Sequence, residues 1–360
     1  MQNFVALILA GGGGSRLWPM SRDEKPKQML PLVNKHSMFK VSVERLAPLF
    51  TPDRIYISTG GAYVDGLRAE CPEIPEENFI PEPSRRNNAA AVALAITIIE
   101  KRHPDAIVAM LTADHHIGKI EHFRTVLETS AKLANEGKIV TLGITPTVAS
   151  TGFGYIEQGE HLGTENDLDY YKSKRFTEKP DVVRASQFVA SGKYSWNSGM
   201  FIWQASKAMA EFKRQQGEMY NLFMQLQATV DTPDYQQTLI SIWEQTPKIS
   251  IDYAIMEGAE DMVVIPVDIG WNDVGTWSSL YDVLPRDKFG NPMKDSEQDR
   301  IVLDANDTLL FSDKLTVAIG VDNIIVVETD DVLMVIHKDR AQEVKQIVNY
   351  LRDNNMEDYL

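Results

Sequence analysis

The chain has 360 residues and a formal net charge of −15, from 36 basic against 51 acidic residues. Its 43% hydrophobic and 24% charged residues are globular averages, which excludes a disordered, collagen-like or coiled-coil protein. So acidic a surface repels nucleic acid and anionic lipid, and neither is expected as a partner. The single cysteine, Cys71, excludes an internal disulfide and a thiolate metal site and fits a reducing compartment.

The sequence contains no segment typical of a membrane anchor or a secretory signal. The longest apolar runs, such as AAAVALAITII at 89–99, are too short to span a bilayer. The N-terminus has no basic region ahead of its apolar stretch, which a secretory signal requires. We therefore expect a cytoplasmic protein.

The first 285 residues alternate short apolar runs with helical periodicity. Residues 4–10 (FVALILA) form a continuous apolar run that ends in glycines, typical of a buried parallel strand. Strand, helix and strand at this spacing predict βαβ units, hence a parallel sheet with helices on both faces and a doubly wound, Rossmann-like α/β fold. Further strands are expected at 54–59, 78–81, 106–112 and 139–144, with helices at 38–49, 63–69, 87–101 and 121–136.

After Pro146 the alternation is less regular. Two strands, TGFGYIEQG and YYKSKRFTEKP, are expected on either side of a polar, acidic loop at 160–169. A long amphipathic helix is expected at 205–227 and a second one at 234–245, before a strand at 262–271.

The last part of the chain has a different pattern. A turn-rich, charged break at 285–296 precedes short β-like runs eight to ten residues apart, and stacked rungs are one way to arrange them. An amphipathic helix at 339–353 then follows. We predict two domains: an α/β domain over 1–285 and a small β-helix-like element with a terminal helix over 286–360.

The most informative stretch is LILAGGGGSRLWPMSRDEKPKQMLPL at 7–32. It matches neither the dinucleotide fingerprint, which needs a third glycine where Arg16 stands, nor the P-loop, which needs Gly-Lys-Ser/Thr. What remains is a run of glycines, Gly11–Gly14, followed by basic residues that include Arg16 and Lys27. Backbone donors combined with Arg and Lys are the groups that bind a triphosphate and stabilise charge during its transfer.

This motif, with its LWPxSR…PKQ continuation, resembles the N-terminal motif of sugar-nucleotide pyrophosphorylases, and among them the mannose-1-phosphate guanylyltransferases. The resemblance extends along nearly the whole chain in the expected order. It includes FTEKP at 176–180, WNSGMF at 196–201, SIDYAIME at 250–257 and WNDVGTW at 271–277.

The resemblance implies the reaction GTP + α-D-mannose 1-phosphate → GDP-mannose + diphosphate, with Mg²⁺ as cofactor. It implies that Arg16 and Lys27 are catalytic and hold the triphosphate. The nucleotide-binding set that it implies is Leu9, Gly11, Gly12, Gly13, Gly14, Ser15, Arg16, Lys27, Arg86 and Asn87. The sugar-phosphate set is Gly154, Glu178, Lys179 and Asn197, with Lys179 on the phosphate and Glu178 on sugar hydroxyls.

Two aspartates are candidate metal ligands, because Mg²⁺ prefers one or two carboxylates together with water and substrate oxygens. Asp114 ends an apolar strand at the carboxyl edge, where open α/β sheets bind ligands, and Asp273 lies just beyond a later strand. The resemblance assigns the metal to both positions. His115 and His116 follow Asp114, but adjacent histidines project to different sides and no Cys or Glu cluster accompanies them, which disfavours zinc.

One segment departs from the family pattern, and it leaves alternatives open. The family typically has EPxGRNTAPA where this chain has EPSRRNNAAA at 82–91, so base selectivity is less secure than phosphate chemistry. The alternatives are a pyrophosphorylase for another nucleotide and hexose 1-phosphate, or a non-catalytic regulator that binds sugar nucleotides.

Longer relatives append a phosphomannose isomerase domain, for which this chain has no room, so a single activity is expected. A homodimer through the β-rich tail is also expected, from its exposed strand edges.

Overall fold

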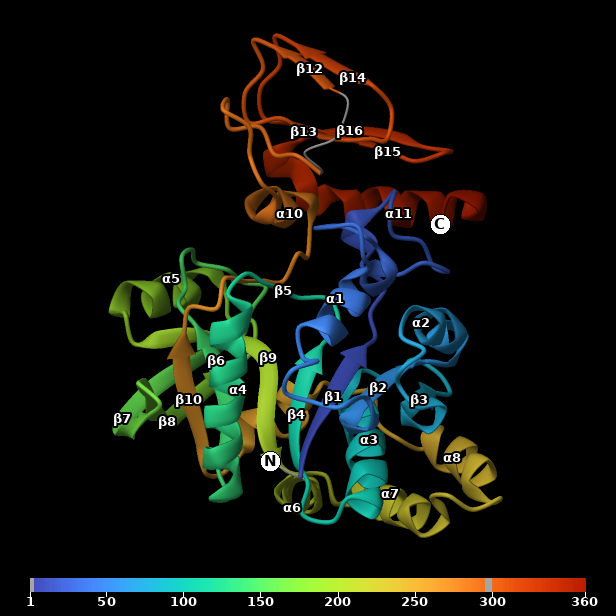
Figure 1. Ribbon diagram of the computed structural model, residues 1–360, viewed down its shortest axis with the longest axis vertical. Helices are drawn as coiled ribbons and strands as arrows, with labels where there is room; N and C mark the ends of the chain where they lie inside the picture. The colour runs from blue at the N-terminus through green and yellow to red at the C-terminus, as the bar shows by residue number, and fades with distance from the viewer. Residues whose placement is uncertain (1–2, 295–299) are drawn as a thin grey trace. The chain divides into compact units, whose positions relative to one another are not determined.

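The computed structural model describes residues 3–294 and 300–360, which form two compact units (Figure 1). The first, here called the sheet unit, contains residues 3–11, 45–112 and 117–271. The second, here called the rung unit, contains residues 12–44, 113–116 and the described part of 272–360. Residues 12–44 therefore pack with the C-terminal part of the chain. The predicted domain boundary at 285 stays a prediction, and positions 295 and 296 of the predicted break lie outside the described residues.

The sheet unit is built on a nine-stranded sheet. In spatial order the strands are β3 (Phe79–Glu82), β2 (Ile55–Gly60), β1 (Phe4–Ala10), β4 (Ile107–Thr112), β9 (Tyr194–Gln204), β6 (Ile139–Ile144), β10 (Met262–Val267), β8 (Leu168–Thr177) and β7 (Tyr155–Glu165). The run at 4–10 is β1 itself, parallel to β2 on one side and β4 on the other. This confirms the buried parallel strand expected from its continuous apolar sequence.

The sheet is mixed rather than purely parallel, because β9 runs antiparallel between β4 and β6. The pairing of β9 with β6 contains a register shift between Thr141 and Gly143. The sequence of β9, YSWNSGMFIWQ, places Asn, Ser and Gly in the middle of an apolar strand. These polar residues interrupt the pattern of apolar residues from which a strand is recognised in a sequence. The WNSGMF motif thus lies on a central strand.

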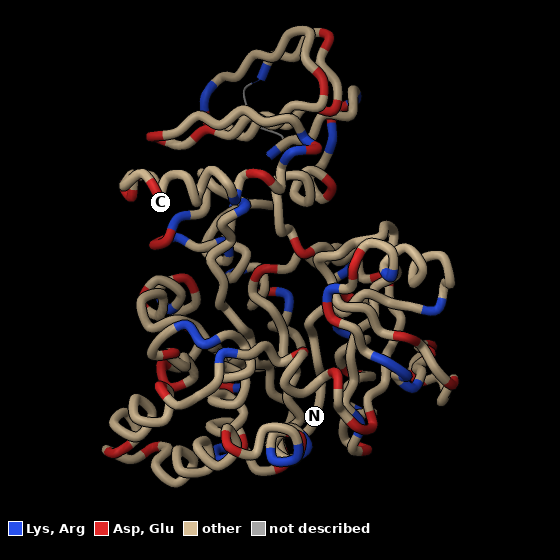
Figure 2. The backbone as a smooth tube through the Cα atoms, turned by 180° about the vertical axis from the view of Figure 1, so that it is seen from behind, with Lys and Arg blue, Asp and Glu red and all other residues tan. Residues whose placement is uncertain are grey.

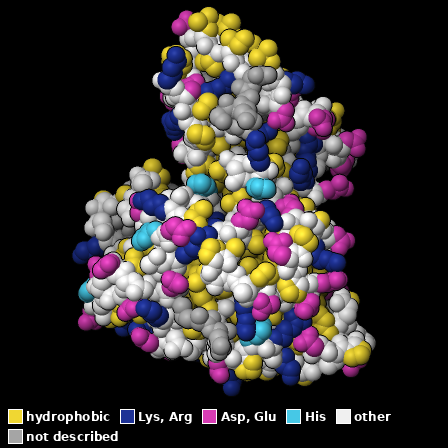
Figure 3. Space-filling model, in the orientation of Figure 1, with side chains coloured by type: hydrophobic (Ala, Val, Ile, Leu, Met, Phe, Trp, Pro, Cys, Tyr) yellow, Lys and Arg dark blue, Asp and Glu magenta, His cyan; other side chains and the backbone are white. Residues whose placement is uncertain are grey.

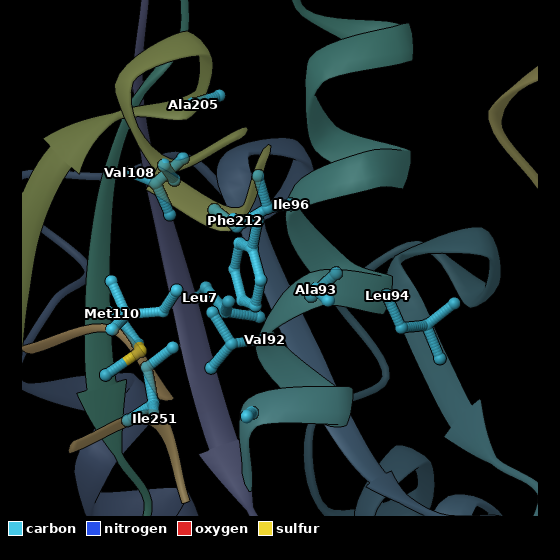
Figure 4. Close-up of a cluster of buried hydrophobic side chains, with 14 of the residues drawn as sticks. Leu7, Val92, Ala93, Leu94, Ile96, Val108, Met110, Ala205, Phe212 and Ile251 are labelled. Carbon is cyan, nitrogen blue, oxygen red and sulfur yellow. The ribbon is translucent and has the colours of Figure 1, made fainter. Parts of the chain in front are cut away.

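Helices surround the sheet, and some of them share a large apolar cluster with its strands. They are α2 (Val64–Glu70), α3 (Asn88–Arg102), α4 (Ile120–Asn135), α5 (Val182–Ser191), α6 (Ala205–Gln215), α7 (Gly217–Thr229), α8 (Tyr235–Trp243) and α9 (Ile251–Ala254). Figure 4 shows Val92 and Ile96 of α3 and Phe212 of α6 packed with Leu7 of β1 and Met110 of β4. The helix α4 contacts β4, β6 and β9, and its buried side chains lie outside this cluster, which places α4 on the opposite face.

Two expected elements differ in the structure. The helix expected at 205–227 is two helices, because Gln216 leaves helical geometry (φ −134°, ψ 55°) just before Gly217. The acidic loop expected at 160–169 is mostly strand, since β7 continues to Glu165 and β8 starts at Leu168. Asn166 and Asp167 make the turn with positive φ, which Asn and Asp tolerate better than most residues. Alternating polar residues in a two-stranded ribbon resemble a loop when only composition is considered.

The rung unit contains the predicted stacked strands. Its elements are α1 (Met38–Glu44), α10 (Trp277–Val283), β12 (Arg300–Leu303), β13 (Leu309–Phe311), β14 (Thr316–Ile319), β15 (Ile324–Glu328), β16 (Leu333–His337) and α11 (Val344–Asp353). β12 is parallel to β14 and β13 is parallel to β15, as in successive rungs, whereas β16 is antiparallel to β15. Leu17, Trp18 and Trp277 share one core with α11 and the inner strand faces. The short strands β5 (His116–Ile117) and β11 (Trp271–Asn272) lie where the chain passes between units.

The surface combines dispersed charge with exposed apolar side chains, several of them in the rung unit. Acidic and basic residues are interspersed along the backbone of each unit (Figure 2). Hydrophobic side chains gather over β12 and β14 (Figure 3), where Ile301 and Leu303 pair in register with Val317 and Ile319 and all four are more than half exposed. Within the described residues, every helix is too short or too polar to cross a membrane.

Candidate active site

The predicted site residues fall into two groups, one in each unit. The group in the rung unit comprises Gly12, Gly13, Gly14, Ser15, Arg16, Lys27, Asp114 and Asp273. The group in the sheet unit comprises Leu9, Gly11, Arg86, Asn87, Gly154, Glu178, Lys179 and Asn197.

The glycine loop starts at the carboxyl end of β1. At position 14 both the backbone conformation and the space available require glycine. Gly14 has φ 61°, and a Cβ added there would lie 2.5 Å from Cβ of Lys27. Its carbonyl accepts hydrogen bonds from the Leu17 N–H (2.8 Å) and from Oγ of Ser21 (2.8 Å). A Cβ added at Gly13, by contrast, would meet nothing within 4 Å. The loop is therefore anchored at Gly14 and has open space beside Gly13, as close approach of a ligand to the backbone requires.

Lys27 connects the two predicted metal ligands. It is 5% exposed, and its Nζ donates to Oδ2 of Asp114 at 2.9 Å and also to the backbone carbonyl of Asp273. The three residues come from chain segments far apart in the sequence, and the fold of the rung unit brings them together. Burial by itself would raise the pKa of Asp114, but the charges of Lys27 and His115 lower that pKa below its usual value. Asp114 is therefore held as a carboxylate.

The backbone after Asp273 is strained. Val274 is a buried β-branched residue with φ 45°, a conformation that such residues rarely adopt and that costs about 1–3 kcal/mol. Its N–H donates to Oδ1 of Asn272 at 2.7 Å, and the Gly275 N–H donates to Oδ1 of Asp273 at 3.2 Å. Such strain persists only where the surroundings impose it, and it is typical of ligand-binding positions.

The two arginines after the glycine loop have different partners. Nη1 of Arg16, whose side chain is exposed, donates to Oε1 of Gln342 at 3.1 Å. Arg22 pairs with Asp331 at 2.7 Å and donates from Nε to the Pro19 carbonyl at 2.7 Å. Arg22 thus holds the Pro-rich loop against the residues between β15 and β16. Although it belongs to the basic motif, it is a structural residue in this arrangement.

The sugar-phosphate candidates of the sheet unit lie together. Asn197 on β9 donates its backbone N–H to the Gly154 carbonyl at 2.8 Å, and a Cβ on Gly154 would lie 2.5 Å from Oε2 of Glu178. Lys179 has φ 44°, and its exposed ammonium is 2.6 Å from Oε1 of Glu178. Burial opposes the charged form of Lys179, but Glu178 raises its pKa above the usual value. Lys179 is therefore a fixed cation beside a buried carboxylate.

The structure adds Asp252, which the sequence did not single out. Its Oδ1 accepts a hydrogen bond from Nδ2 of Asn197 at 3.0 Å. Burial first, and the charge of Glu178 second, raise the pKa of Asp252 to about 6. The only signal in the sequence was its place inside the SIDYAIME motif.

Residues 82–91, which depart from the family pattern, form hydrogen bonds with the residues just before Asp252. Arg86 donates to the Thr246 carbonyl at 3.0 Å, and Oδ1 of Asn88 accepts the Ile251 N–H at 2.8 Å. Nε of Arg86 is buried with no hydrogen-bond partner among the described residues. Asn87 caps α3 with φ 66° and ψ 173°, which is unusual for a residue other than glycine. The Asn at position 88 therefore has a structural function of its own.

Each unit carries groups that can bind phosphate, and the sheet unit also carries acceptors for sugar hydroxyls. The rung unit supplies a glycine loop, Arg16, Lys27 and two aspartates, with Lys27 bonded to the carboxylate of Asp114 and to the backbone carbonyl of Asp273. The sheet unit supplies a lysine beside buried carboxyl and amide acceptors. Among the described residues, no group of three or more His, Cys, Asp or Glu side chains is placed to hold a metal by itself. The two carboxylates match a cation that takes most of its ligands from substrate and water. The fold and these groups define a nucleotidyltransferase.

Comparison with known proteins confirms this class. The chain belongs to the nucleotidyl transferase family, whose model matches residues 5–288, and residues 298–351 match the MannoseP isomerase/GMP-like beta-helix domain. The α/β fold with a small β-helix-like element is therefore confirmed.

Similar proteins include Mannose-1-phosphate guanylyltransferase RfbM of Salmonella typhimurium, 39% identical over 99% of this chain and 74% of that protein. The Xanthan biosynthesis protein XanB of Xanthomonas campestris is 37% identical over 98% of this chain and 74% of its own length. Among solved structures, a protein described as mannose-1-phosphate geranyltransferase from Thermus thermophilus superposes with a TM-score of 0.88. It is 32% identical and covers 97% of this chain and 99% of its own.

Proposed function

We propose that this nucleotidyltransferase catalyses GTP + α-D-mannose 1-phosphate → GDP-mannose + diphosphate. The observation that carries the proposal is the buried contact of Lys27 with Asp114 and with the Asp273 carbonyl, next to the anchored glycine loop. The choice of substrates is supported by the guanylyltransferase relatives that match the whole chain.

The chemistry requires alignment and charge neutralisation rather than an activated protein nucleophile. A phosphate oxygen of the sugar phosphate forms the new bond to the α-phosphorus as the bond to diphosphate breaks. Arg16 and Lys27, with the backbone amides of the glycine loop, hold the triphosphate and stabilise charge that develops on the departing diphosphate. Lys179 holds the phosphate of the incoming sugar, while Glu178 and Asn197 bind its hydroxyls.

Asp114 and Asp273 would hold a divalent cation, for which we propose Mg²⁺. Their carboxylates are hard oxygen ligands, and the ionised state of Asp114 in this structure suits that use. When bound, the cation neutralises phosphate oxygens during transfer. Asp114→Ala should abolish diphosphate release, and release that survives this change undiminished would refute the metal assignment.

The decisive experiment is a panel of nucleoside triphosphates against hexose 1-phosphates, with diphosphate detection. The proposal expects the highest kcat/KM for GTP with mannose 1-phosphate and a requirement for divalent metal. Preference for a pyrimidine nucleotide would overturn the guanylyl assignment. Binding without turnover in every combination would favour a non-catalytic sugar-nucleotide regulator. The homodimer and the cytoplasmic location expected from the sequence stay predictions, and light scattering would test the first.

A further inference from the structure

From the contact between Asp252 and Asn197, we propose that Asp252 is a positioning residue of the sugar-phosphate site, which fixes the side-chain amide of Asn197 in one orientation. The inference rests on the proposed function, because Asn197 is a sugar-contacting residue only if the chain binds a hexose phosphate.

The hydrogen bonds around Asn197 determine which way its amide points. Oδ1 of Asn197 accepts the Gly199 N–H at 3.0 Å, and Nδ2 donates to Oδ1 of Asp252 at 3.0 Å. A backbone N–H can only donate and an ionised carboxylate can only accept, so both neighbours select the same orientation. Among the residues that the structure describes, Nδ2 of Asn197 has Asp252 as its acceptor, so its second N–H can donate to a hydroxyl of the sugar. Without Asp252, the Gly199 N–H would be the remaining hydrogen-bond partner of this amide among the described residues.

The segment that carries Asp252 is itself held rigidly. Ser250 caps α9, with its Oγ accepting the Tyr253 N–H at 3.4 Å and its carbonyl accepting the Ala254 N–H at 2.8 Å. The Ile251 N–H is held by Asn88, as described above, and the Ile249 carbonyl accepts the Ala89 N–H at 3.3 Å. Asp252 is therefore presented to Asn197 from a fixed backbone, as a positioning residue requires.

The charges near Asp252 predict how its action depends on pH. Glu178 opposes the ionisation of Asp252, and Lys179 favours it. Two other titratable groups are near: Glu257 accepts the backbone N–H of Glu178 at 3.2 Å, and Tyr253 follows Asp252 in the chain. A protonated Asp252 can donate as well as accept, so it no longer selects one orientation of the amide. Sugar-phosphate binding should therefore weaken as the pH falls through about 6.

The test compares Asp252→Ala and Asp252→Asn with wild type, using GTP and mannose 1-phosphate. Asp252→Ala should raise KM for the sugar phosphate by about tenfold, which is the effect of losing one hydrogen bond to a charged group, and leave KM for GTP unchanged. Asp252→Asn keeps an acceptor for Nδ2 and should stay within about threefold of wild type. Asp261→Asn is a matched control, because it removes an exposed carboxylate that pairs with Lys207 elsewhere in the sheet unit.

A pH profile provides the readout that a merely structural role would not change. The phosphate of the substrate also titrates near pH 6, so the informative quantity is the ratio of wild type to Asp252→Asn in kcat/KM for the sugar phosphate. This ratio should fall between pH 7.5 and pH 5.5. A constant ratio, or an unchanged sugar-phosphate KM in folded Asp252→Ala, would overturn the inference. If wild type does not turn over these substrates, the proposed function fails instead.

Discussion

Nζ of Lys27 lies 2.9 Å from Oδ2 of Asp114, so the lysine of the glycine-loop motif is an ion-pair partner of a predicted metal ligand. The pair is largely buried, with side-chain exposures of 7% and 27%. A lysine in this position neutralises the Asp114 carboxylate when no cation is bound. Lys27 and Asp114 should therefore be energetically coupled.

Lys27→Met should lower kcat by roughly 10²–10³-fold, because Lys27 is expected to stabilise charge that develops in the transition state. Methionine keeps most of the side-chain volume, so the packing of Lys27 against Gly14 is preserved. Steady-state kinetics with both substrates varied will measure the effect. A change in KM alone would show that Lys27 only positions the triphosphate.

The coupling of the pair can be measured separately from activity. Lys27→Met should destabilise the protein by roughly 1–3 kcal/mol, because it leaves the partly buried Asp114 carboxylate without its hydrogen-bond donor. Asp114→Asn should remove most of that penalty. A double-mutant cycle on the free energy of unfolding should give a coupling above about 1 kcal/mol. Additive effects would mean that solvent screens the pair.

Two neighbouring glycines provide a matched pair of variants. Gly14→Ala should destabilise the protein by about 1–3 kcal/mol, because alanine at φ 61° is strained and its Cβ would overlap Cβ of Lys27. Gly13→Ala should leave stability within about 0.5 kcal/mol, since its Cβ enters open space. If a triphosphate approaches the backbone there, Gly13→Ala should still raise KM for GTP. Urea denaturation and kinetics of both variants test the two statements.

Asp252→Asn should stabilise the protein at neutral pH. Because its pKa is raised from 3.8 to about 6, the folded state binds more protons than the unfolded state between these values. Wild type therefore loses stability as the pH rises through this range, by roughly 2–3 kcal/mol at most. The asparagine variant should be more stable by up to that amount at pH 7.5 and nearly equal to wild type at pH 4. An equal difference at both pH values would exclude titration of Asp252 as the cause.

His103 should make the sheet unit sensitive to acid. Nη1 of Arg54 lies 3.1 Å from Nδ1 of His103, and the Tyr56 hydroxyl lies 3.0 Å from Nε2. Arginine can only donate, so Nδ1 accepts and Nε2 carries the proton of a neutral ring. Burial, then Arg54 and Arg102, lower the pKa of His103.

Stability from a neutral His103 is lost as the pH falls below about 6.5, where the unfolded chain takes up the proton first. His103→Gln should therefore lose less stability than wild type between pH 7.5 and pH 5.5. If chemical denaturation shows that both proteins lose the same free energy of unfolding over this pH range, groups other than His103 cause the loss of stability in acid.

Local patterns were sufficient for some features of this protein. The apolar run at 4–10, the glycines after it and Asp114 after β4 were each predicted from neighbouring residues and lie where expected. The antiparallel strand β9 was missed because its polar centre breaks the period. Asp252 was missed because its significance depends on a hydrogen bond to Asn197, which lies 55 residues away in the sequence.

The sequence by itself determined the class of protein. Apolar runs and glycines in consecutive residues predicted the α/β fold and a local basic loop for phosphates, and the resemblance of several short motifs in order implied a nucleotidyltransferase. The tertiary structure decided which charged residues pair with one another and which segments pack together. Lys27 contacts Asp114, Arg22 pairs with Asp331 instead of remaining free for phosphate, and residues 12–44 pack with the C-terminal rungs. Ion pairs and packing depend on distance in space, which the net charge of −15 and the residue order do not contain.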